Sequence, residues 1–162
     1  MTRIFLDATT PIALGTIGEL EHLTSFAGDL VVLPAVQNEV TTEPAQTNLG
    51  RFIEQYEVET TDPIVDDHLR KAKEVLGEEE KIGDVYLIGA VLSYTADDLP
   101  VGIVSDDRRV RTTARGLGAI VTGTIGVVVR AVEDGLDQEE AYTLVDRIDS
   151  HGLHMTGSLR EK

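Results

Sequence analysis

Residues 4–11 read Ile-Phe-Leu-Asp-Ala-Thr-Thr-Pro, and this stretch decides the fold class. Its three apolar residues predict a short buried strand, and Asp7 follows directly at the carboxyl end of that strand. Thr10 and Pro11 then predict the start of a helix, because threonine caps free backbone N–H groups and proline fits the first helical position. The stretch therefore predicts a core strand, a carboxylate at its end and a following helix.

The same pattern of apolar run, polar turn and helix recurs along the chain. Further core strands are expected at 30–33, 101–104 and 119–121, and a short strand at 57–60. We expect helices at residues 35–40, 49–56, 63–76, 83–94, 108–117, 125–132 and 139–148, and two short helices between Thr10 and Leu23 that Gly15 and Gly18 separate. Such runs are typical of a parallel sheet covered on both faces. The predicted fold is α/β: one three-layer α/β/α domain over residues 1–150 around a central, mainly parallel sheet, with a C-terminal tail at 151–162.

The composition excludes several classes of protein. The 162 residues contain no cysteine, which excludes a disulfide scaffold, a thiolate metal site and a cysteine nucleophile. The net charge of −15 excludes a globally basic nucleic-acid binder but leaves a local basic patch open. Acidic residues spread along the chain favour a salt-adapted, halophilic protein, because concentrated salt screens their repulsion; a mesophilic acidic protein is the alternative. Since no apolar run reaches the length of a signal or membrane-spanning segment, we expect a cytoplasmic protein with no membrane partner.

Carboxylates stand where ligands bind in parallel sheets, beyond the carboxyl ends of the strands. Asp7 follows the first strand, Asp106 and Asp107 follow the strand at 101–104, and the helices add Glu39 and Asp84. Like charges at close range are costly unless a cation lies among them. Carboxylate oxygens suit Mg²⁺ or Mn²⁺, so the pattern predicts a divalent metal site.

Five segments in this order resemble the motifs of the PIN-domain nucleases, in particular the VapC-like toxins and a related subfamily of predicted nucleic-acid-binding proteins. The segments are residues 4–14, 32–40, 83–90, 104–109 and 122–127, and the resemblance covers about residues 3–150. It implies a PIN-like fold and a bound metal that activates water for attack on an RNA phosphodiester.

The resemblance also implies roles for single residues. Asp7, Glu39, Asp84 and Asp107 would be catalytic, and Thr9 would orient a ligand or water near Asp7. Asp7, Glu39, Asp84 and one or both of Asp106 and Asp107 would bind the metal. Two alternatives stay open: Glu78 or Glu80 shares or takes the role of Asp84, and either Asp106 or Asp107 is the direct ligand.

Each acid also has a purely structural interpretation. Asp7 could cap the turn before the first helix, and Glu39 could be a solvated helical acid. Asp84 could be a favourable charge in the first turn of a helix. Asp106 or Asp107 could cap the helix that follows, while the other binds metal.

Four arginines, Arg108, Arg109, Arg111 and Arg115, lie within eight positions on the helix that starts at the proposed metal site. They could bind RNA phosphates, or they could form surface salt bridges with the abundant acids. In high salt, counterion release would contribute little to RNA binding. His151 and His154 in the tail lack partners for a zinc motif.

The sequence therefore predicts a metal-dependent endoribonuclease, which the resemblance implies to be the toxin of a toxin–antitoxin pair, with RNA as substrate, a separate antitoxin chain as partner and a homodimer as the assembly. The alternative is a catalytically silent PIN module that binds RNA or a protein partner. A phosphatase of the haloacid-dehalogenase type is disfavoured, because Thr9 stands where that family needs a second aspartate.

Overall fold

The computed structural model describes residues 2–80 and 82–150, so the predicted tail and its two histidines lie outside the described residues. One four-stranded sheet has the order β2-β1-β3-β4, and every pair in it is parallel. The strands are β1 (Arg3–Leu6), β2 (Asp29–Val31), β3 (Val101–Val104) and β4 (Ile120–Thr122). Leu6 lies opposite Val104, so the residues that follow β1 and β3 meet at one edge.

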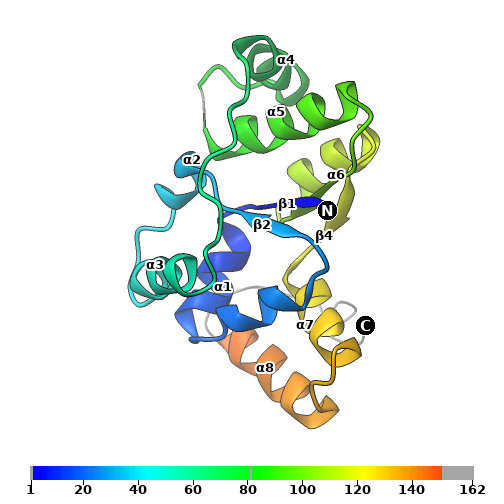
Figure 1. Cartoon of the computed structure of the whole chain (residues 1–162). Helices are drawn as coiled ribbons and strands as arrows, with labels where there is room; N and C mark the ends of the chain where they lie inside the picture. Colours follow the sequence, from blue (N-terminus) through cyan, green and yellow to red (C-terminus); the bar gives the residue numbers. More distant parts are fainter. Residues whose placement is uncertain (1, 81, 151–162) are drawn as a thin grey trace.

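Helices cover both faces of the sheet, which confirms the three-layer α/β/α prediction (Figure 1). One layer contains α4 (Asp66–Leu76), α5 (Gly83–Ala96) and α6 (Arg108–Gly116). The other contains α1 (Thr9–Thr16), the 3₁₀ helix η1 (Leu20–Ser25), α3 (Ala45–Gln55), α7 (Thr124–Glu133) and α8 (Gln138–Ser150). The short helix α2 (Pro34–Gln37) contacts α5 beyond the end of β2. Within the described residues, no helix is both long and apolar enough to cross a membrane.

The central strand β1 carries the middle of the hydrophobic core. Phe5 and Leu6 are fully buried, because helices cover both faces of the sheet. The ring of Phe5 meets the ring of Tyr94 edge to face, with 5.7 Å between centroids and 74° between planes. Ile103 on β3 and Ile88 on α5 complete this part of the core. Aliphatic residues thus form most of the interior, since aromatic residues make up only 4% of the sequence.

Several local predictions are wrong or shifted, among them the helix predicted at 49–56, which begins at Ala45, and the helix predicted at 63–76, which begins at Asp66. The helix predicted at 35–40 ends at Gln37, because the N–H of Glu39 bonds to Val36 and the chain turns away. The strand predicted at 57–60 does not form, and only an isolated bridge joins Val31 to Glu59. Thr10 does not cap α1, which starts at Thr9. The hydroxyl of Thr10 instead lies 2.9 Å from the hydroxyl of Thr124 on α7.

Candidate active site

Asp7 lies at the carboxyl edge of the sheet, where β1 and β3 end side by side. Its N–H donates to the carbonyl of Val104 at 2.9 Å, which continues the strand pairing by one residue. Its side chain accepts a bond from the N–H of Ala8 at 2.7 Å on Oδ1 and from the hydroxyl of Ser105 at 2.6 Å on Oδ2. Only 3% of the residue is exposed, so a carboxylate is held almost wholly inside the protein.

The surroundings of Asp7 disfavour its charge. Burial raises the pKa of Asp7 to about 6, the hydrogen bonds from Ser105 and Ala8 oppose this rise, and the negative charges of Asp84 and Glu39 add to it. Two carboxylates from separate segments therefore act on the carboxylate of Asp7. A cation placed among them would stabilise the ionised form of Asp7.

Glu39 and Asp84 both lie at the N-terminus of α5. The Oε1 of Glu39 accepts a bond from the N–H of Gly83 at 2.9 Å, at the positive end of the helix dipole. This approach requires glycine, because a Cβ at residue 83 would collide with the Glu39 carboxylate. Asp84 lies in the first turn of α5, and its Oδ2 accepts a bond from Nη2 of Arg109 at 3.0 Å.

Ser105 connects two of the predicted site residues, and sequence reasoning assigned it no role. Its fully buried hydroxyl donates to Asp7 and accepts a bond from the N–H of Asp107 at 3.0 Å. The signal that could have found it is its place one residue after β3, next to the residue that follows β1. Recognising that signal requires the pairing of the two strands.

Asp106 and Asp107 both have structural partners. Asp107 caps α6 by accepting the N–H of Val110 at 3.0 Å on Oδ1, which confirms the capping alternative for this residue. Asp106 accepts the N–H of Thr124 at 2.7 Å on Oδ1, and the Thr124 hydroxyl donates to its Oδ2. The N–H of Asp106 donates to Oγ1 of Thr9 at 3.0 Å. The metal role of both acids stays a prediction.

The four arginines of α6 have different environments. Arg109 pairs with Glu78 at 2.8 Å and with Asp84 at 3.0 Å, and these two bonds raise its pKa. Arg111 donates to the carbonyl of Ser105 at 2.9 Å. Arg108 and Arg115 are exposed, and their side chains form no hydrogen bond or ion pair within the described part of the chain. The salt-bridge alternative thus describes Arg109, whereas Arg108 and Arg115 leave their guanidinium groups open to a ligand.

Comparison with protein families identifies the fold. A family model described as PIN domain matches residues 3–162. The chain belongs to the PIN-domain family. Its fold is also similar to the crystal structure of PAE2754 from Pyrobaculum aerophilum, with a TM-score of 0.54 and 14% identity over 82% of this chain and 90% of that chain. No curated protein matches it. The five motifs thus point to the right family, and its nuclease-type fold is the one that the structure shows.

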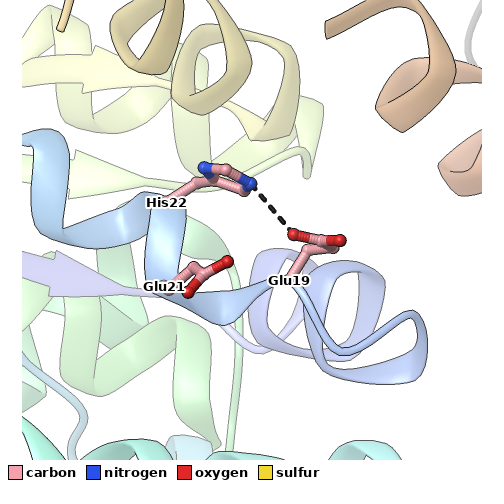
Figure 2. A group of neighbouring side chains, drawn as sticks. All are labelled: Glu19, Glu21 and His22. Atoms are coloured by element: carbon pink, nitrogen blue, oxygen red, sulfur yellow. Dashed lines mark hydrogen bonds and ion pairs between the residues drawn. The ribbon is translucent and has the colours of Figure 1, made fainter. Parts of the chain in front are cut away.

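A second group of possible metal ligands in this PIN domain lies at the other end of α1 from Asp7. Glu19, Glu21 and His22 place one ligand atom each within 4.8 Å of one another, and no other group in residues 2–80 and 82–150 does so (Figure 2). Sequence reasoning missed this group. Glu19 is already paired, since its Oε2 lies 3.0 Å from Nε2 of His22 and its Oε1 accepts a bond from Arg147 at 2.9 Å. Asp7, Glu39 and Asp84 do not form such a group, so their ligand atoms do not all lie within 4.8 Å of one another.

The raised pKa of Asp7 predicts a pH-dependent stability of the PIN domain without metal. Because the pKa of Asp7 is higher in the folded state than in the unfolded state, the protonated side chain favours the folded state. This contribution to the unfolding free energy is complete below about pH 4 and is lost as the pH rises through about 6. Relative to Asp7→Asn, the wild type should lose about 2–3 kcal/mol of unfolding free energy over that range. Urea unfolding in EDTA at several pH values measures the difference.

The matched control for this experiment is Asp134→Asn, because Asp134 is exposed at the C-terminus of α7. Its unfolding free energy should follow that of the wild type at every pH. Parallel curves for the wild type and Asp7→Asn would contradict the raised pKa.

Proposed function

We propose that this PIN domain is a divalent-metal-dependent endoribonuclease that hydrolyses RNA phosphodiester bonds. One observation carries the proposal: a buried aspartate, Asp7, has a pKa raised to about 6 and lies within the field of Glu39 and Asp84 at the carboxyl edge of a parallel sheet. Perturbed carboxylates at such an edge mark sites of ligand binding and catalysis. The nuclease-type fold of the family supports the same reaction class.

The residues present fit a hard divalent cation. All donors are carboxylate oxygens, which suit Mg²⁺ or Mn²⁺. Each oxygen of Asp7 accepts one hydrogen bond within the described residues and so keeps acceptor capacity for a ligand. Asp7, Glu39 and Asp84 would hold the ion, with Asp106 or Asp107 as the further predicted ligand. When bound, the ion supplies a Lewis acid that lowers the pKa of water and neutralises charge on the phosphate.

The protein side chains would orient the reacting groups. Ser105 and Ala8 fix the carboxylate of Asp7, and the N–H of Gly83 fixes that of Glu39. Thr9 accepts the N–H of Asp106, so its own hydroxyl hydrogen is directed elsewhere and would bind a phosphate oxygen or water. Arg108 and Arg115 would bind flanking phosphates as charged donors.

Cleavage of a mixed RNA pool tests the proposal. We expect cleavage with Mg²⁺ or Mn²⁺ that EDTA abolishes, measured in both low and molar salt because the acidic composition favours a salt-adapted protein. A folded protein that cleaves no RNA in any of these conditions would contradict the nuclease proposal. It would favour a silent PIN module that binds RNA or a protein partner.

The biological role that we infer is that of a toxin in a toxin–antitoxin pair. In this setting the nuclease would form a homodimer in the cytoplasm, and a separate antitoxin chain would inhibit it. Growth arrest on expression, relieved by that second chain, would support this role, whereas unimpaired growth with active nuclease would favour a stand-alone enzyme.

A further inference from the structure

A cavity of about 660 Å³ lies beside the proposed metal site and shares Glu39 with it. Glu39, which follows α2, and Gly83, the first residue of α5, both line this cavity and are joined by the hydrogen bond described above. The remaining walls come from residues 33–38, from the segment 61–64 and from the first two turns of α5. The volume lies within the range of small-molecule sites, roughly 300–1,000 Å³. A ligand in the cavity would therefore adjoin a phosphate bound at the metal site.

The chemistry of the walls suits a flat, uncharged ligand. Pro34, Pro63, Ile64 and Ile82 contribute apolar surface, and the half-buried ring of Tyr86 adds the one aromatic wall. Tyr86 follows Asp84 by two residues on α5, and its hydroxyl bonds to no residue in the described part of the chain.

The charges around the cavity exclude a phosphate. Among the described residues, no arginine or lysine lines it, while Asp62 and Glu39 do. Oδ2 of Asp62 accepts bonds from Nη2 of Arg3 at 3.1 Å and from the hydroxyl of Tyr94 at 2.6 Å, so the negative charge of Asp62 is already paired with a guanidinium. Asn38, exposed at the rim, offers an amide with both donor and acceptor groups.

We propose that this cavity binds a nucleobase of the RNA, on the nucleotide adjacent to the scissile phosphate. Tyr86 would stack on the base, and the amide of Asn38 would hydrogen-bond to its edge. Single-stranded RNA is recognised in this way, by stacking of unpaired bases on aromatic side chains and hydrogen bonds to their edges. The proposal rests on the proposed function, because it takes RNA as the ligand of the neighbouring metal site. It makes Tyr86 and Asn38 determinants of base preference.

The test measures binding rather than cleavage. Asp7→Asn serves as the background, so that the RNA stays intact, and fluorescence anisotropy gives the affinity for a short single-stranded oligoribonucleotide. Tyr86→Ala should weaken binding roughly tenfold, since stacking on one aromatic side chain commonly contributes that much. Tyr86→Phe keeps the ring and should bind nearly as well as the parent. Tyr142→Ala, which removes an exposed tyrosine of α8, should have no effect.

Abasic substitutions in the oligonucleotide identify the base. One abasic position should weaken binding to the parent roughly tenfold and should have no further effect in Tyr86→Ala, which shows that the two groups contact each other. If Tyr86→Ala lowers the unfolding temperature, Tyr86→Leu takes its place in the same cycle. An affinity of Tyr86→Ala within twofold of that of the parent would overturn the proposal, and so would equal effects of the abasic substitutions in both proteins. Either result would favour a protein segment as the ligand of the cavity.

The two proposals fail in different ways. A PIN domain that cleaves RNA without coupling between Tyr86 and any base would retain the nuclease function and lose the base pocket. A protein that shows the coupling but cleaves no RNA would retain the pocket and lose the nuclease function.

Discussion

Asp7→Asn should reduce metal-dependent RNA cleavage by on the order of 100- to 1,000-fold, the effect of removing one preorganised charged group from an active site. The substitution keeps the size of the side chain, and the amide oxygen can still accept the N–H of Ala8. What it removes is the negative charge of Asp7, the one carboxylate that is buried among the described residues, and a divalent cation bound there needs that charge. The loss should therefore appear in kcat with the fold intact, measured by cleavage assays beside circular dichroism.

The control for this experiment is Asp134→Asn, which removes an exposed carboxylate at the C-terminus of α7, whereas the proposed site lies near the N-terminus of that helix. It should cleave RNA as the wild type does. Cleavage that survives in Asp7→Asn would show that the site assignment is wrong or that a contaminating nuclease causes the activity.

The sequence predicts the core strands because each is a continuous apolar run that ends at a polar turn. It does not predict their order, which depends on how crossover helices pack. At 57–60 the alternation of Glu57, Val58 and Glu59 is typical of a strand, but that segment meets β2 only through the bridge to Val31. The local pattern of this segment cannot show that β2, the strand beside it, ends at Val31.

The same limit applies to the site. Acids at strand ends can be found in the sequence, since the carboxyl ends of parallel strands share one edge. The bond from Ser105 to Asp7 joins residues 98 positions apart, and the bond from Gly83 to Glu39 spans 44 positions. Neither follows from spacing, because each depends on strand register or helix packing. The different partners of the two adjacent aspartates also become visible only in the structure: Asp107 caps a helix, and Asp106 binds Thr124.

The four arginines of α6 look equivalent in the sequence, but the structure gives their side chains different partners. Arg109 is bound by Asp84 in the first turn of α5 and by Glu78 in the segment between α4 and α5. Arg108, its neighbour in the chain, is also exposed, but its guanidinium forms no ion pair within the described residues. The sequence offers four equivalent candidates for phosphate binding, whereas the structure leaves Arg108 and Arg115, the two without such a side-chain bond, as the stronger candidates.

Phe5→Ala should lower the unfolding free energy by about 3–5 kcal/mol, the usual cost of truncating a buried phenylalanine. Phe5 is fully buried on the central strand, so the cavity left behind would be closed on both sides by packed helices. Its edge-to-face contact with Tyr94 adds about 0.5–1.5 kcal/mol beyond the buried area. Since a domain of this kind is stable by only about 5–15 kcal/mol, the loss is a large fraction of the total.

Urea unfolding of Phe5→Ala, Tyr142→Ala and the wild type measures this cost in one buffer. Tyr142 is an aromatic residue that is 67% exposed, so its truncation should change the unfolding free energy by less than about 0.5 kcal/mol. A double-mutant cycle of Phe5→Ala with Tyr94→Leu isolates the ring contact, because the two residues should be coupled if the rings touch. A cost for Phe5→Ala no greater than that for Tyr142→Ala would show that β1 is not the centre of the core, and the position of Asp7 at its end would lose its structural support.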